Sequence, residues 1–206
     1  ARCYVDATVN EGERDTVFAR RWQRGAHAGQ LEHPGDHVVA EIGGVPLLIV
    51  RGEPESSSPR GQLRALHNVC RHRAGPLATC DGRNAKSLIC RYHGWSYALD
   101  GQLRGAPEMH DVANFELGAI RLPEAHVAEW QGLVFATVDE ALAPPFEAFV
   151  DGIDARIGAE RDLASFTHHH RVGYDIECNW KVYVDNYLEG YHVPHVHPEL
   201  NRMLDY

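Results

Sequence analysis

Two short pairs of cysteine and histidine constrain this 206-residue chain more than any other feature. The first pair is Cys70-x-His72, and the second, Cys90-x-x-His93, follows after seventeen residues. Each pair comes soon after an apolar run with the character of a β-strand, so we expect each in a loop at a strand end. Thiolate sulfur and imidazole nitrogen are metal ligands, and the four side chains therefore predict a metal centre held by two loops.

This ligand set has two interpretations. Two cysteines and two histidines can bind one zinc ion, although zinc sites usually pair Cys with Cys and His with His at short spacing. Here each loop brings one of each, which suits a two-iron, two-sulfur cluster of the Rieske type, in which both thiolates hold one iron and both imidazoles the other. Gly75 and Gly94 follow the two loops and allow tight turns around a cluster. The pattern favours the cluster, with zinc as the alternative.

Composition excludes several classes of protein. The chain carries 29 acidic and 20 basic residues, a formal net charge of −9, which argues against nucleic-acid binding. The longest apolar run, residues 45–50, is far too short to span a bilayer, and no secretory signal is present. Five cysteines make a poor disulfide framework, so we expect a cytoplasmic protein with no membrane partner, in which Cys3, Cys80 and Cys178 are buried or free thiols.

The order of the expected elements indicates an all-β middle. Residues 13–31 have the apolar spacing of a helix. Short strands are expected at residues 38–42, 45–50, 63–69, 87–89, 96–99, 102–104 and 133–138, with Asp100-Gly101 as a hairpin turn. Pro144-Pro145 marks a boundary, after which residues 166–178 are expected to form a strand and residues 180–191 a helix.

A second histidine-rich segment lies at residues 179–198. Non-haem iron(II) oxygenases hold their metal with two histidines and one carboxylate. Glu189 and His192 are three residues apart and would share a helix face. Pro194 and Pro198 interrupt a regular helix, so His197 could fold back to complete a site. The residues alone leave the ligand pair open, and a His-rich helix end is as often structural as metal-binding.

The stretch from His67 to Trp95 resembles the Rieske domains of ring-hydroxylating and related oxygenases, and the chain resembles the N-terminal half of their large (α) terminal oxygenase subunit. The resemblance implies that four residues hold a [2Fe–2S] cluster: Cys70, His72, Cys90 and His93. In the second segment the family's motif falls on three residues: Glu189, His192 and His197. The two histidines would be ligands of a mononuclear iron, and Glu189 the acid that links a Rieske histidine to an iron-ligand histidine.

The same resemblance implies further site residues and an α+β fold. Asn179 matches a position near the iron, and His195 would lie beside the ligands or at the surface. Apart from the resemblance, side chains alternate between the faces of the strand expected at residues 166–178, so residues 168–170 are expected to be strand residues near a pocket or the surface, with a third metal as the alternative. We expect an N-terminal helical segment packing on the catalytic domain (1–36), an all-β Rieske domain (37–145) and the beginning of a helix-grip (START-like) catalytic domain (146–206). The family's third iron ligand, a carboxylate, comes later than residue 206, so the piece alone is expected to be truncated and inactive.

The resemblance also implies an activity. A reductase of the flavin or ferredoxin type would pass electrons from NAD(P)H to the cluster, and the mononuclear Fe(II) would use them with O2 to hydroxylate a small organic substrate. Electrons would cross between subunits of a homotrimer, or a multiple of it, from His93 to Glu189 of the neighbour. Residues 178–194 are similar to choline monooxygenase and relatives that act on quaternary ammonium compounds. The alternatives are an aromatic ring-hydroxylating dioxygenase, a Rieske electron-transfer protein without oxygenase activity, and a zinc-stabilised binding module.

Overall fold

The structure is a computed structural model and describes residues 2–158 and 162–204. Its contacts divide the chain into two compact units. The larger unit comprises residues 14–169, and the smaller unit joins residues 1–13 to residues 170–206. The smaller unit therefore combines the two ends of the chain.

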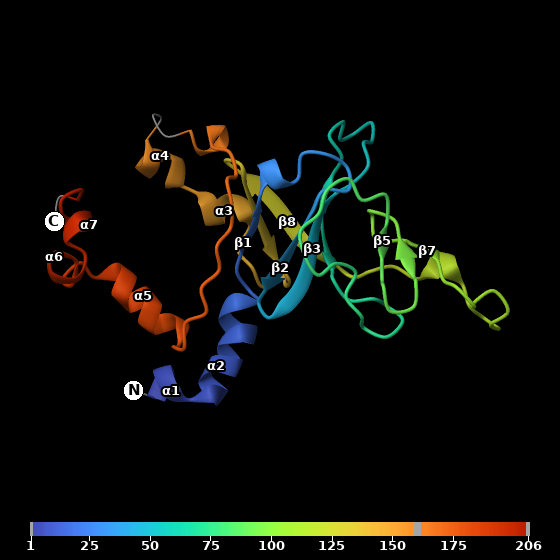
Figure 1. The fold of residues 1–206 in the computed structure, drawn as a ribbon, viewed down its shortest axis with the longest axis horizontal. Coiled ribbons are helices and arrows are strands. Elements are labelled where there is room, and N and C mark those ends of the chain that lie inside the picture. Colours follow the sequence, from blue (N-terminus) through green and yellow to red (C-terminus); the bar gives the residue numbers. More distant parts are fainter. Residues whose placement is uncertain (1, 159–161, 205–206) are drawn as a thin grey trace. The chain divides into compact units, whose positions relative to one another are not determined.

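A six-stranded antiparallel sheet forms the larger unit, with strand order β1-β9-β8-β4-β3-β2. The strands β2, β3 and β8 lie together in Figure 1. Their bounds are β1 Gln23–His27, β2 His37–Ile42, β3 Val45–Arg51, β4 Leu63–His67, β8 Glu124–Trp130 and β9 Leu133–Thr137.

Strand β3 separates two hydrophobic cores because its side chains alternate between the two faces of the sheet. Leu47 and Ile49 belong to a core that also contains Val38 and Ala65. Leu48 and Val50 belong to the other core, which includes Leu66 and reaches both predicted cysteine ligands. All four of these β3 side chains are fully buried. The sheet thus gives the metal loops a rigid base.

A three-stranded sheet, in the order β5-β6-β7, carries the second ligand loop and closes the second core. Its strands are β5 Leu88–Ile89, β6 Ser96–Tyr97 and β7 Leu103–Gly105. The predicted hairpin turn is confirmed: the Gly101 N–H donates to the Ala98 carbonyl (2.9 Å), and Gly101 adopts a left-handed conformation with φ of 86°. A single helical turn η3, Leu117–Ala119, follows this sheet and packs against β7.

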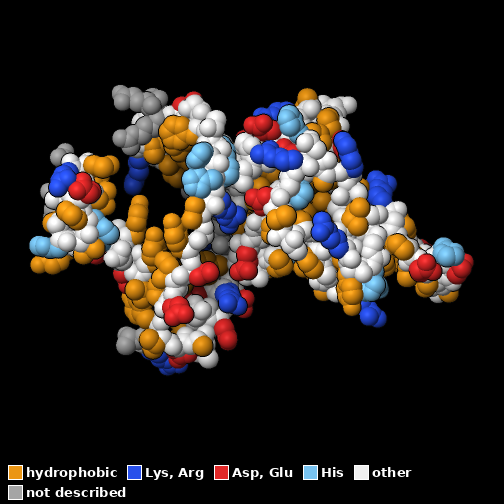
Figure 2. Space-filling model, viewed as in Figure 1, with side chains coloured by type: hydrophobic (Ala, Val, Ile, Leu, Met, Phe, Trp, Pro, Cys, Tyr) orange, Lys and Arg blue, Asp and Glu red, His pale blue; other side chains and the backbone are white. Residues whose placement is uncertain are grey.

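Short helices complete the larger unit. They are η1 Arg14–Phe18, η2 Ala28–Gln30, α3 Phe146–Val150, α4 Ile153–Ile157 and η4 Leu163–Ser165. The helices α1 Arg2–Val5, α2 Ala7–Glu13, α5 Trp180–Leu188, α6 Val193–Val196 and α7 Pro198–Asn201 make up the smaller unit. Of the described residues in the smaller unit, only Val193 is buried, and Figure 2 shows apolar side chains exposed over this region.

Two expectations about secondary structure are wrong, and one strand was not predicted. Residues 13–31 are not one helix, because a π-helical turn ends at Phe18 and β1 then pairs with β9. Glycine at position 25 disfavours a helix by about 1 kcal/mol. It also lets β1 pack closely against β3, since a Cβ at Gly25 would lie 2.4 Å from Ile49 Cδ1. Residues 166–178 contain no strand, because this segment pairs with no neighbour in the described part of the chain. Strand β8 was not predicted; its alternation is weak, and pairing with β4 and β9 defines it.

The predicted α+β organisation, an all-β domain followed by a helical segment, is confirmed. The compact units divide the chain at residues 13/14 and 169/170, so residues 14–36 share a unit with the sheet. The domain bounds 1–36, 37–145 and 146–206 stay a proposal about the whole protein. Across the described residues, no helix has the length and apolar character needed to cross a membrane.

Candidate metal centres

The two predicted ligand loops share one backbone geometry. In the first loop the Cys70 N–H donates to the Gly75 carbonyl (2.9 Å), and the Ala74 N–H donates back to the Cys70 carbonyl (3.0 Å). In the second, Cys90 and Trp95 are joined in the same way (2.9 Å), and the Gly94 N–H donates to the Cys90 carbonyl (2.9 Å). The fifth residue of each loop is left-handed, with φ of 57° at Ala74 and 74° at Gly94. The two cysteines therefore hold equivalent positions in their loops, while the histidine follows two residues after Cys70 and three residues after Cys90.

The four predicted ligands form a buried inner pair and an exposed outer pair. Cys70 and Cys90 are 3% and 2% exposed and form no disulfide. His72 and His93 are exposed, and their ring centroids lie 4.6 Å apart. In the described part of the chain, no three Cys, His, Asp or Glu side chains are grouped closely enough to hold one ion, as a zinc site would require. Separate sulfur and imidazole pairs fit a two-iron cluster, in which each iron takes one pair.

Two aromatic side chains hold these ligands in place. The Tyr97 hydroxyl oxygen lies 3.2 Å from Cys70 Sγ and accepts a hydrogen bond from the Arg71 N–H (3.0 Å). Burial, followed by the adjacent Cys70 sulfur, raises the pKa of Tyr97, so the phenol stays neutral and can donate to a thiolate. The His72 ring stacks on the ring of the buried Trp95, with the two ring centroids 4.8 Å apart. Partial desolvation, with His93 and Arg73 nearby, lowers the pKa of His72 and favours the neutral imidazole that binds metal.

The sequence reasoning missed Asn68 and the role of Tyr97. Asn68 is 5% exposed, and its side-chain oxygen accepts hydrogen bonds from the N–H groups of Leu77 and Ala78 (2.9 and 3.1 Å). These bonds fix the chain just after the first loop. Gly75 permits close packing of the loops, because a Cβ there would lie 3.1 Å from Cys90 Sγ. The sequence does contain a signal for Asn68: an asparagine directly after a predicted strand often forms side-chain hydrogen bonds to nearby backbone groups.

Replacement of Tyr97 by Phe tests the hydrogen bond to sulfur. A hydrogen bond to a charged group contributes about 1.5–3 kcal/mol. If the hydrogen bond stabilises the reduced cluster by about 1 kcal/mol more than the oxidised cluster, its loss lowers the reduction potential by roughly 40 mV. Potentiometric titration followed by visible absorbance measures the change. Tyr92→Phe is the control because its hydroxyl belongs to a side chain that is 64% exposed. An unchanged potential in Tyr97→Phe, or an equal shift in the control, would contradict the role of this hydrogen bond.

A second group of predicted residues follows the C-terminus of α5. Glu189 is the C-cap of that helix, in an extended conformation, and its carboxylate contacts His192 Nδ1 and accepts the His192 N–H (3.3 Å). The expectation that Glu189 and His192 share a helix face is wrong, since α5 ends at Leu188 and the contact forms across a turn. Although burial opposes the shift, hydrogen bonds from His192 and Tyr191 lower the pKa of Glu189, which stays ionised.

The structure brings the two predicted iron-ligand histidines together. His192 is the N-cap of the short helix α6 and His197 is its C-cap, with Pro194 in the first turn. Their ring centroids lie 5.3 Å apart, with the ring planes at 78°. Because Glu189 occupies Nδ1 of His192, the other ring nitrogen, Nε2, is left to bind a metal. This pair fits two of the three protein ligands of a mononuclear iron site, and no third is grouped with them in the described residues.

The remaining predicted residues have other surroundings. Asn179 is the N-cap of α5 and accepts the Lys181 N–H (3.1 Å), so its place near an iron stays a prediction. His195 is exposed. Cys3, Cys80 and Cys178 are exposed free thiols.

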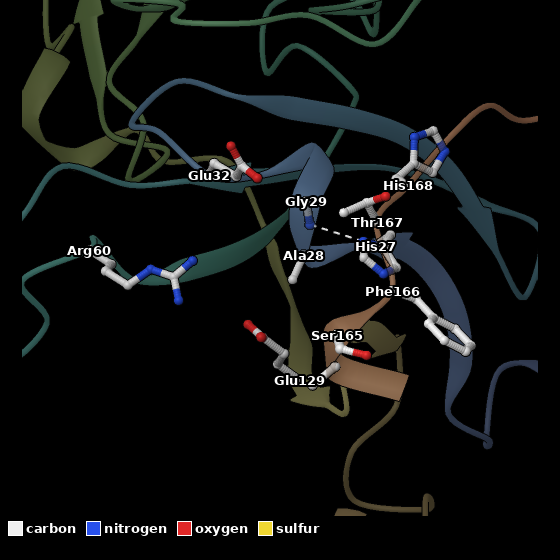
Figure 3. Close-up of a pocket in the computed structure, with 12 residues that line it drawn as sticks. His27, Ala28, Gly29, Glu32, Arg60, Glu129, Ser165, Phe166, Thr167 and His168 are labelled. Carbon is white, nitrogen blue, oxygen red and sulfur yellow. Dashed lines mark hydrogen bonds between the residues drawn. The ribbon is translucent and has the colours of Figure 1, made fainter. Parts of the chain in front are cut away.

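His168 lines a cavity of about 430 Å³ with His27, from the end of β1, while Arg60, Glu32 and Glu129 line its other side (Figure 3). The two histidine rings lie 6.2 Å apart. None of the predicted ligands lies in this cavity.

Two domain families match this chain. Residues 21–116 match the Rieske [2Fe–2S] domain, and residues 163–206 match the catalytic domain of the ring-hydroxylating α subunit. The chain therefore contains a Rieske domain and part of the catalytic domain of a ring-hydroxylating α subunit.

The names of several similar proteins refer to quaternary ammonium compounds. The chain is 34% identical to choline monooxygenase of Arabidopsis thaliana, over 98% of this chain and 49% of that one. It is 35% identical to the carnitine monooxygenase oxygenase subunit of Escherichia coli (strain K12), over 96% and 51%. The crystal structure of the quaternary ammonium Rieske monooxygenase CntA with L-carnitine superposes with a TM-score of 0.87 at 30% identity, covering 99% of this chain and 56% of that one.

The chain spans about half the length of the curated relatives it matches. At the level of the domain families, these matches support the predicted cofactors, a Rieske cluster and a mononuclear iron, while the use of O2 belongs to the proposed function. The ligand roles of individual residues remain predictions that the loop geometry supports.

Proposed function

We propose that the whole protein is the terminal oxygenase component of a Rieske non-haem iron system that hydroxylates a small quaternary ammonium compound. The observation that carries this proposal is the presence of two separate ligand sets in one chain. An exposed imidazole pair lies over two buried thiols, and a second imidazole pair is tied to an ionised carboxylate. When bound, the cluster would supply single electrons and the mononuclear iron would activate dioxygen.

We place the route of the electron between two copies of the chain, from His93 of one to Glu189 of the next. Glu189 already contacts His192, and its carboxylate has a second oxygen with which to accept a hydrogen bond from an imidazole N–H. Residues 67–79 and 86–99, which carry the ligand loops, contain Arg71, Arg73, Lys86 and Arg91 but no acidic residue. The exposed His93, with these basic residues as its neighbours in the ligand loops, suits an acidic partner group. A homotrimer or a multiple of it would provide the contact.

The partners of this component follow from its chemistry. A reductase of the flavin or ferredoxin type would carry electrons from NAD(P)H to the cluster. A pure electron-transfer protein would need only the first ligand set, so the grouping of Glu189, His192 and His197 favours the oxygenase.

The substrate class is supported by the relatives named choline and carnitine monooxygenase. Aromatic ring hydroxylation is the second candidate, because naphthalene 1,2-dioxygenase from Rhodococcus sp. with bound indole superposes with a TM-score of 0.76 at 26% identity. The higher TM-score of 0.87 to the carnitine-bound monooxygenase favours the quaternary ammonium class.

The substrate proposal is tested with the full-length protein, a reductase and NADH. Oxygen uptake and products are measured with choline, carnitine and naphthalene in parallel. We expect at least one quaternary ammonium compound to be oxidised with matched oxygen consumption, and naphthalene to be unchanged. Oxidation of naphthalene with none of the amines would reverse the assignment.

A further inference from the structure

Glu13 makes a set of polar contacts that the sequence motifs do not predict. It is the last residue of α2, and its carboxylate accepts hydrogen bonds from Lys181 Nζ at both oxygens (2.6 Å each) and from the Trp180 indole N–H (2.9 Å). The Glu13 and Lys181 side chains are only 16% and 18% exposed. Hydrogen bonds from Lys181 and then from Trp180 lower the pKa of Glu13, so it is ionised at neutral pH. Glu13 is therefore the shared acceptor for two consecutive residues of α5.

A second contact ties the same N-terminal segment to α5. The Tyr4 hydroxyl donates to Asp185 Oδ2 (2.8 Å), and Lys181 Nζ lies 5.9 Å from the centre of the Tyr4 ring. Lys181 and Asp185 are four residues apart, so they lie on one face of the helix. Residues 2–13 thus hold one face of α5 at two successive turns.

Helix α5 leads directly into the second metal-ligand group. Asn179 caps its first turn, while Glu189 leaves its last turn and contacts His192. A helix of nine residues moves as a rigid body, so its orientation fixes where Glu189 starts. Contacts at the first turn, through Trp180 and Lys181, therefore bear on the position of the Glu189–His192 pair.

We propose that Glu13 is a positioning residue for the mononuclear iron site: by holding Trp180 and Lys181, it fixes α5 and thereby the Glu189–His192 pair. The inference rests on the proposed function, because it takes His192 as an iron ligand. Glutamine cannot replace Glu13, since its amide has one acceptor oxygen and would turn N–H donors toward the Lys181 ammonium group. Aspartate keeps the charge on a shorter side chain.

The test uses the full-length protein with its Rieske cluster and compares Glu13→Gln, Glu13→Asp and Glu11→Gln. Glu11 lies exposed on the same short helix and serves as the matched control. Fe(II) affinity of the mononuclear site is measured by equilibrium dialysis at low temperature, and thermal unfolding and the visible spectrum of the cluster are recorded alongside. We expect Glu13→Gln to weaken Fe(II) binding about three- to tenfold, with an unchanged cluster spectrum. Glu13→Asp should recover part of the affinity, and Glu11→Gln should match the parent.

Parental Fe(II) affinity in Glu13→Gln, even with a lower Tm, would overturn the inference and leave Glu13 as a purely structural residue. Equal loss in Glu11→Gln would overturn it as well. His192→Ala separates this result from the proposed function. If His192→Ala loses iron and Glu13→Gln does not, only the inference about Glu13 fails. If His192→Ala keeps its iron, the proposed iron site itself is contradicted.

Discussion

Replacement of Glu189 by Gln is expected to slow substrate oxidation by about 10- to 100-fold while both metal centres stay occupied. One carboxylate oxygen contacts the His192 ring and the other accepts the His192 N–H, and a remaining lone pair of the carboxylate would accept the His93 N–H of the neighbouring copy. Glutamine is the same size but has a single acceptor oxygen and no charge. The two imidazoles would therefore lose their common acceptor, while the metal ligands themselves are unchanged.

Single-turnover experiments isolate this effect. The protein is reduced, mixed with O2 and substrate, and cluster reoxidation and product are followed together. Glu177→Gln is the control, because Glu177 is exposed and lies outside the ligand group. Parental rates of cluster reoxidation in Glu189→Gln would show that the carboxylate does not link the two centres.

Replacement of Cys90 by Ser is expected to remove the Rieske cluster and reduce reductase-driven oxidation by roughly two orders of magnitude or more. Cys90 is 2% exposed and belongs to the buried sulfur pair. Iron would be bound by its thiolate, and a serine hydroxyl does not lose its proton readily enough at neutral pH to replace that ligand. The visible absorbance and the acid-labile sulfide content report the cluster directly.

Cys80→Ser provides the matched control for this change. Cys80 lies between the two loops in the sequence but is an exposed free thiol, so its replacement should preserve both colour and activity. A colourless parent protein that contains zinc and no labile sulfide would instead favour the zinc-stabilised module.

The loops that carry the predicted ligands of the first metal centre could be placed from the sequence because they are short and lie next to strands with clear apolar runs. Cys70 and Cys90 come within three residues of β4 and β5, and the backbone of each loop closes on itself by local hydrogen bonds. Local chemistry is sufficient for such a site. The contact between Tyr97 and Cys70 was missed because it joins strand β6 to a loop residue 27 positions away, and spacing carries no information on such a contact.

The N-terminal region could not be predicted for a similar reason. Residues 13–31 have helical spacing, but β1 forms there because β9 offers an edge with which to pair. Likewise the partner of Glu13 lies more than 160 residues away, on α5. Residues 166–178 illustrate the opposite case: Val172, Tyr174 and Ile176 alternate as in a strand, yet they are exposed and form none. Strand propensity is realised only where a partner strand is available.

The most direct test of the central claim, that electrons pass between copies of the chain, combines the two variants above. Differently tagged Cys90→Ser and Glu189→Gln chains are co-expressed, and assemblies containing both are purified and assayed. In a mixed assembly the Cys90→Ser copy keeps Glu189 and the iron ligands, and the Glu189→Gln copy keeps its cluster. We predict that mixed assemblies regain substrate oxidation although each parent variant is impaired. Mixed assemblies no more active than the variants alone would contradict transfer between copies.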